Sequence, residues 1–215
     1  MKLTDLKVVY ICPDHNTKYN QRKQHMDTLL RKIGFKDIIH HKSGTESYPS
    51  CLANAIKTIL TTYLTEPILV LEDDVEFTGT DEFEYPEDTD AIYFGLSFWG
   101  GHLTKNYHCG HSIFRPYSPS QVRVINMLGG HAILFVSKQY KEAVINEMDN
   151  CIKHSLHTDI VMSRLQRNFF VLANKIPSFY QSLAFNEEQI GNKDNVELYT
   201  KIQITGELIG VKLLK

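Results

Sequence analysis

Residues 67–77, PILVLEDDVEF, place the most apolar short run of the chain directly before three consecutive acids. Residues 68–71 have the continuous apolar character of a strand that is buried on both faces of a sheet. The C-terminal end of such a strand is where open α/β sheets hold their ligands. The stretch therefore predicts a central strand with Glu72, Asp73 and Asp74 at its ligand-binding end.

The segments before this strand alternate between strand-like and helix-like patterns. We expect strands at residues 6–12 and 37–40 and amphipathic helices over residues 26–33 and 52–64. Gly34 supplies the stop of the first helix. This β-α-β-α-β order predicts an α/β fold with a mostly parallel central sheet flanked by helices.

The second half of the chain is less regular. Further strands are expected at residues 91–98, ending at Trp99-Gly100-Gly101, and at residues 132–136, 169–173 and 178–183. Helices are expected at residues 138–152 and 159–167, with Thr158 as N-cap. Residues 102–130 are loop-rich with ambiguous short strands, and the tail at 201–215 is a hairpin or an extended arm. No repeat or linker argues for a boundary, so we expect a single domain.

Composition narrows the class of protein. The chain has 215 residues and a formal net charge of -2, without a long basic run, so it lacks the electrostatic pattern of a nucleic-acid-binding protein. No segment approaches the roughly 18 apolar residues of a membrane span, and Asp5 and Lys7 interrupt any signal-peptide core. The four cysteines lie far apart without a C-x-x-C pair, so we expect free thiols and a cytoplasmic location.

The three acids require an explanation because adjacent carboxylates repel one another at neutral pH. Along a strand, Glu72 and Asp74 would point one way and Asp73 the other. A hard divalent cation removes the repulsion and suits oxygen ligands, with water and a diphosphate completing its shell. The alternative is a solvated turn in which the acids bind nothing.

The apolar strand, the acid-x-Asp sequence and the return to apolar residues resemble the DxD motif of GT-A glycosyltransferases. More narrowly, LVLEDDVEF (69–77) is similar to the LEDD segment of glycosyltransferase family 25. Further segments resemble that family in the same order: YPSCLANAIKTIL (48–60), GGHAILFVSKQY (129–140), HTDIVMSRLQ (157–166) and IPSFYQS (176–182). The resemblance spans roughly residues 7–183 and is carried by the order and spacing of the motifs.

The sequence also departs from the family pattern. Asn54 and Ala55 replace its Ser-His pair, and YICPDHNTKYNQR (10–22) replaces its N-terminal Asn-Leu-x-x-x-x-x-Arg. The compact size resembles the glycosyltransferase domains that large algal viruses use on their own capsid proteins, and this would place the chain in a host cytoplasm.

The resemblance implies one GT-A domain, with residues 1–100 as the nucleotide-sugar half and residues 101–215 as the acceptor half. It implies transfer of a sugar from a nucleotide diphosphate sugar, with UDP as the expected nucleotide, to a hydroxyl of a glycan or glycoprotein. Mn2+ or Mg2+ would stabilise the charge that grows on the leaving diphosphate.

Site residues follow from the same resemblance. Asp74 is the expected direct metal ligand, and Glu72 or Asp73 would act through water or on the ribose; we assign Glu72 to the metal and Asp73 to the nucleotide. The expected nucleotide contacts are Ile11, Cys12, Pro13, Arg22, Asn54 and Asp73. Arg22 could instead be a solvated helix charge.

Asp159, at a predicted helix start, has two interpretations. It could interact favourably with the helix dipole for about 0.3–1 kcal/mol, or it could be the general base that deprotonates the acceptor. In a retaining enzyme it would instead bind sugar hydroxyls. Trp99, Gly130 and His131 are candidate acceptor-binding residues. Equally, Trp99 could belong to the core and Gly130 to a turn.

Other classes of protein fit less well. The spacings of the ten histidines do not match a structural zinc site, although one of His131, His154 and His157 could complete the shell of a cation. A signalling receiver domain carries its acidic pair after the first strand, whereas here the acids follow the third. A haloacid-type phosphatase requires Asp where Glu72 stands. A non-catalytic nucleotide-sugar-binding module remains open, and the apolar tail at 202–214 could mediate oligomerisation.

Overall fold

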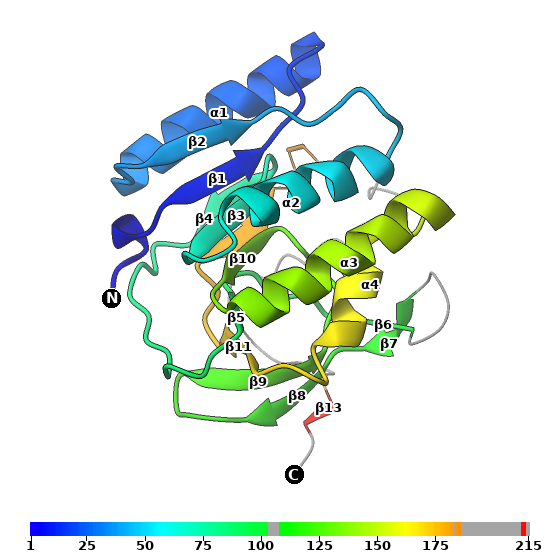
Figure 1. Cartoon of the computed structure of the whole chain (residues 1–215). Helices are drawn as coiled ribbons and strands as arrows, with labels where there is room; N and C mark the ends of the chain where they lie inside the picture. Colours follow the sequence, from blue (N-terminus) through cyan, green and yellow to red (C-terminus); the bar gives the residue numbers. More distant parts are fainter. Residues whose placement is uncertain (103–107, 183, 186–211, 214–215) are drawn as a thin grey trace.

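A computed structural model describes residues 1–102, 108–182, 184–185 and 212–213 of the chain. Its centre is a nine-stranded sheet with the order β13-β8-β9-β11-β5-β10-β3-β1-β2 (Figure 1). Two short two-stranded sheets, β12-β4 and β6-β7, accompany it. The strand pairing gives seven strands of the large sheet one direction, while β9 and β10 run the opposite way.

The first half of the chain forms the predicted β-α-β-α-β unit. Its elements are β1 (Val8–Ile11), α1 (Thr17–Ile33), β2 (Ile38–His41), α2 (Ser50–Thr62) and β3 (Ile68–Glu72). β1 pairs in parallel with both β2 and β3, so their C-terminal ends meet at one edge of the sheet. Gly34 ends α1 with a φ of 105°, a conformation that glycine adopts without steric strain.

The second half completes the sheet with strands of both directions. Its elements are β4 (Val75–Phe77), β5 (Ala91–Tyr93), β6 (Trp99–Gly101), β7 (His108–His111), β8 (Ile113–Pro116), β9 (Gln121–Asn126), β10 (Ala132–Phe135), α3 (Lys138–His154), α4 (Thr158–Leu165), β11 (Val171–Asn174), β12 (Phe179–Gln181) and β13 (Lys212–Leu213). β10 lies antiparallel between β3 and β5. The α/β class with a mostly parallel sheet flanked by helices is confirmed.

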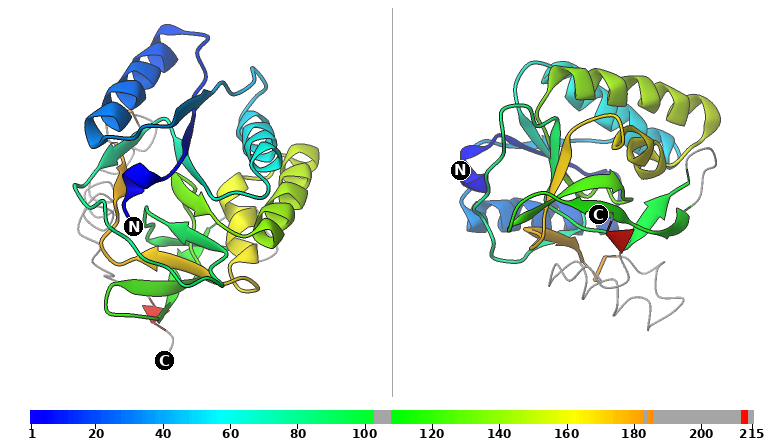
Figure 2. Two further views of the ribbon diagram at one scale, coloured as in Figure 1. Left: turned by 60° about the vertical axis from the view of Figure 1, so that its left-hand side comes forward. Right: turned by 90° about the horizontal axis from the view of Figure 1, so that it is seen from below.

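The helices cover both faces of the sheet. One apolar cluster joins the sheet to α2, α3 and α4 through residues such as Ile59, Met148 and Val161. The other joins it to α1 through Met26 and Leu30. The right-hand view of Figure 2 shows α2 and α3 on one side of the sheet and α1 on the other. Consecutive strand residues alternate between the clusters, which explains why β3 is apolar without interruption.

Several local expectations were wrong. Strand β5 ends at Tyr93 instead of continuing to residue 98, and the expected stop at Trp99-Gly100-Gly101 is itself strand β6. Strand β3 ends at Glu72, and a turn at residues 73–74 leads into β4, so the three acids do not alternate along one strand. Thr158 is the first residue of α4, and His157 is the N-cap.

The C-terminal region is only partly described. β12 pairs with β4 in a separate two-stranded sheet, because this segment crosses the end of β3 instead of joining the large sheet. Within the expected tail at 201–215, Lys212 and Leu213 pair in parallel with β8. The other residues of that tail lie outside the described part of the chain.

Candidate functional site

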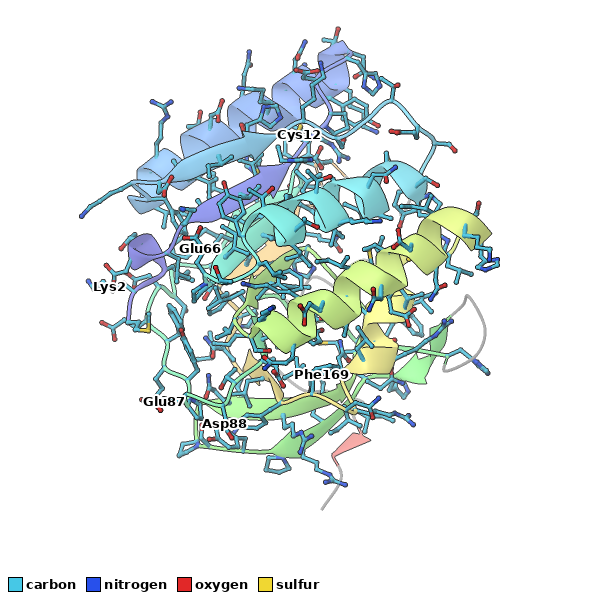
Figure 3. The ribbon with its side chains drawn as sticks, viewed as in Figure 1. Lys2, Cys12, Glu66, Glu87, Asp88 and Phe169 are labelled. Carbon is cyan, nitrogen blue, oxygen red and sulfur yellow. The ribbon has the colours of Figure 1, made fainter. Side chains whose placement is uncertain are left out.

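A cavity of about 430 Å³ lies where β1 and β3 end. We call it the carboxylate cavity, because Glu72, Asp73 and Asp74 contribute to its lining. Ile11 and Pro13 contribute from the end of β1, and Arg22 from α1. Figure 3 labels Cys12 at this end of β1. The parallel pairing of β1 with β3 places Ile11 beside Glu72, which brings the expected nucleotide contacts next to the acids.

Arg22 forms a buried ion pair within this cavity. Its Nη1 lies 2.8 Å from Oδ1 of Asp73, and the two side chains are only 12% and 10% exposed. The helix that carries Arg22 begins at Asn16, whose side chain accepts a hydrogen bond from the backbone N–H of Tyr19. Its burial excludes the solvated-charge interpretation of Arg22. The cavity lining therefore contains three carboxylates, the Arg22 guanidinium and the ammonium of Lys18.

Glu72 experiences the charge of its neighbours directly. Burial raises the pKa of Glu72 well above its ordinary value, and the negative charges of Asp74, Asp159 and Asp73 raise it further. Its backbone N–H donates to the carbonyl of His131 at 3.0 Å. A Cβ atom on Gly130 would lie 3.3 Å from Oε1 of Glu72, so the glycine leaves space around the carboxylate. A bound cation would relieve this concentration of negative charge.

Asp159 belongs to the same electrostatic environment, although it comes from α4. Its Oδ1 accepts a hydrogen bond from the N–H of Ile160 at 2.8 Å, as suits a carboxylate in the first turn of a helix. Burial raises its pKa above the ordinary value. Its charge acts on both Glu72 and Tyr48. The fold therefore brings Asp159 towards the acids of β3 without placing it in the cavity lining.

The segment that follows β12 closes one side of the cavity. The N–H of Ser182 donates to the carbonyl of Asp74 at 2.6 Å, and the carbonyl of Phe185 accepts a hydrogen bond from Nη2 of Arg22. The Phe185 ring lies 5.7 Å from the Arg22 guanidinium and 5.0 Å from the His25 ring. We call residues 182 and 184–185 the C-terminal strap.

The remaining predicted site residues occupy different surroundings. Cys12 is buried, and its thiol donates to the carbonyl of Pro13 at 3.1 Å. Asn54 lies in α2, and Trp99 is a half-buried residue of β6 whose ring meets Phe98 edge-on. His131 is 2% exposed and packs against Gly95. None of these four lines the carboxylate cavity.

The sequence did not identify every residue that lines the cavity: Lys18, Tyr19, Ser43, Tyr48, Cys51, Leu52 and Phe185 were missed. Tyr48 lines the cavity and is 59% exposed. It lies at the start of YPSCLANAIKTIL, so the motif itself was the available signal. Phe185 lies beyond the last recognisable motif, and nothing in its local sequence indicates a return to the end of β3.

The carboxylates of this cavity can be compared with the ligands that a divalent cation requires. Within residues 1–102, 108–182 and 184–185, no group of three or more His, Cys, Asp or Glu side chains is arranged around a common point. Glu72 and Asp74 nevertheless present carboxylates whose mutual repulsion a hard cation would relieve. The residues thus fit a cation that takes its other ligands from water and a diphosphate, and they do not fit an all-protein metal cage.

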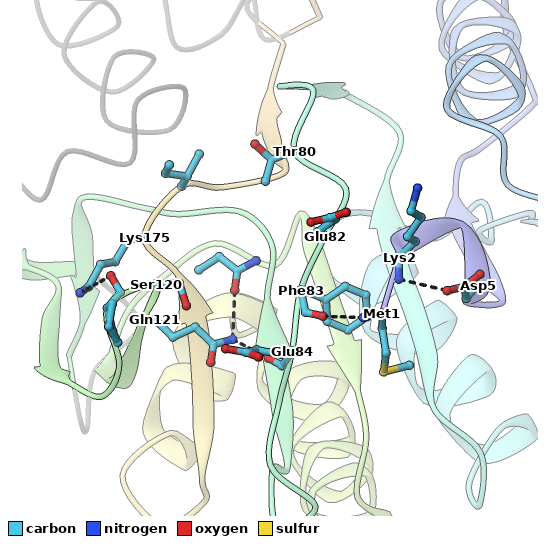
Figure 4. Close-up of a pocket in the computed structure, with 13 residues that line it drawn as sticks. Met1, Lys2, Asp5, Thr80, Glu82, Phe83, Glu84, Ser120, Gln121 and Lys175 are labelled. Atoms are coloured by element: carbon cyan, nitrogen blue, oxygen red, sulfur yellow. Dashed lines mark hydrogen bonds between the residues drawn. The ribbon is translucent and has the colours of Figure 1, made fainter.

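A larger cavity, of about 960 Å³, lies elsewhere (Figure 4). It is bordered by the N-terminal residues, by residues 80–84 and by the ends of β9 and β11. Its polar groups largely bind one another: Gln121 Nε2 donates to the Glu84 carbonyl and to Asn174 Oδ1, and Lys175 Nζ donates to two backbone carbonyls. Three acidic and two basic side chains line each of the two cavities, but only in the carboxylate cavity are the three acids consecutive in the chain.

No protein-family model and no curated protein matches this chain. Among solved structures, it is similar to a nucleoside-diphosphate-sugar pyrophosphorylase from Vibrio cholerae RC9, with 13% identity, a TM-score of 0.47 and coverage of 86% of this chain and 81% of that one. It is also similar to a glycosyltransferase involved in glycosylation of the major capsid of PBCV-1, with 8% identity, a TM-score of 0.37 and coverage of 69% and 74%. An apo UDP-glucose pyrophosphorylase gives 10% identity, a TM-score of 0.47 and coverage of 86% and 80%.

These likenesses are distant, and they assign no substrate to the carboxylate cavity. Among the helices of the described residues, none is both long enough and apolar enough to span a membrane.

Proposed function

We propose that the chain is a metal-dependent glycosyltransferase that moves a sugar from a UDP-sugar to a hydroxyl of a glycan or glycoprotein. The observation that carries the proposal is the convergence of three acids, Arg22 and the end of β1 on one cavity at the ligand-binding edge of the sheet. A nucleotide diphosphate needs an apolar surface for its base and a positively charged partner for its phosphates. Ile11 and Pro13 supply the surface, and Arg22 supplies positive charge.

In this proposal Asp74 and Glu72 hold Mn2+ or Mg2+, which supplies electrostatic stabilisation to the leaving diphosphate. Asp73 keeps Arg22 oriented towards the cavity through their ion pair. Asp159 accepts the proton of the acceptor hydroxyl, and the burial that raises its pKa makes it a better base. We further propose that residues 1–100 bind the donor and that residues 101–215 bind the acceptor within one domain.

Calorimetric titration of UDP with and without Mn2+ tests the metal-binding step. Mn2+ should tighten UDP binding about tenfold or more in the wild type, because it offsets the repulsion between diphosphate and carboxylates. Asp74→Asn should abolish that gain. Asp88→Asn, in the acidic loop at 78–90 outside the cavity, is the matched control and should retain it. Metal-independent binding of UDP, or a full gain in Asp74→Asn, would contradict the proposal.

Turnover distinguishes an enzyme from a binding module. A glycosyltransferase should release UDP from a UDP-sugar when a suitable acceptor is present, and Asp159→Asn should reduce that release while leaving UDP affinity unchanged. A module without catalytic function would bind the nucleotide sugar and release no UDP.

A further inference from the structure

Tyr48, which lines the carboxylate cavity, contacts His157 at the start of α4. Tyr48 comes just before α2, and its phenol oxygen lies 3.1 Å from Nδ1 of His157, the N-cap residue of α4. Their ring centroids are 5.3 Å apart, with an interplanar angle of 53°. The hydrogen bond and the ring contact together fix the orientation of the phenol.

The Tyr48 ring combines exposure with a place in the cavity lining. The residue is 59% exposed, and it lines the cavity together with Leu52 and Glu72. Burial around its hydroxyl raises the pKa of Tyr48, and the charges of Asp159 and Glu72 raise it further, so the hydroxyl stays protonated at neutral pH. The residue thus offers an apolar ring face to the cavity beside acids that can accept hydrogen bonds.

This combination matches the surface of a pyranose. A hexose ring presents C–H groups on one face and hydroxyl groups at its edge, and an aromatic side chain can bind the first while carboxylates bind the second. Tyr48 lies within electrostatic range of both Glu72 and Asp159. A sugar in transfer must lie between the group that holds its diphosphate and the group that activates its acceptor.

We propose that the ring face of Tyr48 binds the transferred hexose and that His157 is the positioning residue that holds this ring in place. The proposal rests on the glycosyltransferase function proposed above. It assigns Tyr48 to the sugar and not to the nucleobase, whose expected surface is formed by Ile11 and Pro13 at the end of β1.

The test compares calorimetric Kd values for UDP, UDP-glucose, UDP-galactose and UDP-N-acetylglucosamine, each with Mn2+. The measured quantity is the Kd of the tightest UDP-sugar divided by the Kd of UDP. Tyr48→Ala should raise this ratio about fivefold to tenfold, as expected for loss of an aromatic contact. Tyr48→Phe keeps the ring face but loses the hydrogen bond to His157, so it should raise the ratio about threefold, less than Tyr48→Ala does. Tyr117→Ala removes another exposed tyrosine, 45% exposed and outside this cavity, and should change nothing.

The role of His157 is tested by loss and rescue. His157→Ala should raise the same ratio about threefold and raise KM more than it lowers kcat, because the ring is less well oriented. His157→Asn should restore the wild-type ratio, since its side-chain amide can take the place of Nδ1 opposite the phenol.

The failure of this proposal is distinguishable from failure of the proposed function. A ratio that Tyr48→Ala leaves unchanged would overturn the assignment, whether UDP and the UDP-sugar keep their affinities or lose them equally. In either case, Mn2+-dependent UDP binding by the wild type would leave the proposed function intact. A wild-type protein that binds UDP neither with nor without Mn2+ would overturn both proposals.

Discussion

Two regions of the molecule, around Lys141 and around Glu72, bury charged groups but differ in the hydrogen bonds that those groups form. Lys141 of α3 is fully buried, and its ammonium donates hydrogen bonds to the carbonyls of Tyr63, Leu64 and Glu66, just after the end of α2. At the end of β3, Glu72 is half-buried among acids, and its side chain forms no hydrogen bond with any other residue that the structure describes.

We interpret the charge of Lys141 as structural and the charges at the end of β3 as the ligand-binding ones of the proposed function. The carbonyls around Lys141 complete its hydrogen bonding within the chain, so the charge holds two helices together. The three carboxylates at the end of β3 outnumber the two basic side chains that line the same cavity, Lys18 and Arg22, so a bound cation would offset the remaining negative charge. If this distinction is right, removing the charge of Lys141 should lower the free energy of unfolding, whereas removing the charge of Glu72 should raise it.

The largest effect is expected for Lys141→Met. The substitution keeps an apolar side chain of similar length but leaves the three carbonyls without a donor, so it should lower the free energy of unfolding by about 3–4 kcal/mol. Urea-induced unfolding measures this loss. Lys138→Met is the control on the same helix, because its side chain is 53% exposed, and it should cost less than about 1 kcal/mol. Equal losses in the two variants would show that Lys141 is not a structural charge.

His131 provides a third case beside Lys141 and the acids at the end of β3, because it is a buried titratable group that stays neutral. Burial lowers the pKa of His131 to about 4, below the value of about 6.5 expected in the unfolded chain. The unfolded state therefore binds the proton first as the pH falls. The wild type should lose about 2–3 kcal/mol between pH 7 and pH 4.5 from this residue.

The pH effect is measured by urea unfolding at pH 7, 5.5 and 4.5. Other groups contribute to the total, so the relevant quantity is the difference between the wild type and His131→Asn. This difference should shrink as the pH falls below 6.5, because the variant lacks the imidazole. A difference that stays constant with pH would mean that His131 is protonated equally in both states.

The smallest expected change in the free energy of unfolding is an increase, in contrast to the decreases predicted above. Glu72→Gln removes one charge from the cluster with little change in shape, so the ligand-free protein should become more stable by about 1 kcal/mol. The same variant should weaken Mn2+-dependent UDP binding. Thermal unfolding without metal measures the gain, with Glu87→Gln in the exposed loop as control (Figure 3). Destabilisation by Glu72→Gln would remove the distinction between the two regions.

The parts of the fold that were predictable depend on local patterns. Helices α1, α2 and α3 and strands β1 and β3 follow from apolar periodicity within about 5–17 residues. Strand β6 was missed because it exists only through pairing with β7, whose sequence contains no recognisable strand pattern. The end of β5 at Tyr93 is likewise set by its neighbours β10 and β11, not by its own sequence.

The site residues were likewise predictable from the sequence only where a local pattern places them. The three acids could be assigned to one corner because they follow a strongly apolar strand, and Arg22 because its helix follows β1. The ion pair between Arg22 and Asp73 required the register of α1 against β3, which no local pattern provides. Tyr48 and Phe185 reach the cavity through loops, so their positions depend on the complete tertiary structure.

The C-terminal strap has a consequence for how the protein is made. The strap contacts Arg22 and Asp74, yet it follows every helix of the described chain in the order of synthesis. A nascent chain can assemble β1, α1, β2, α2 and β3 early, because these elements are contiguous. The wall that the strap contributes arrives only when residue 185 has left the ribosome, so a polypeptide stalled before that point would display its acids on an open surface.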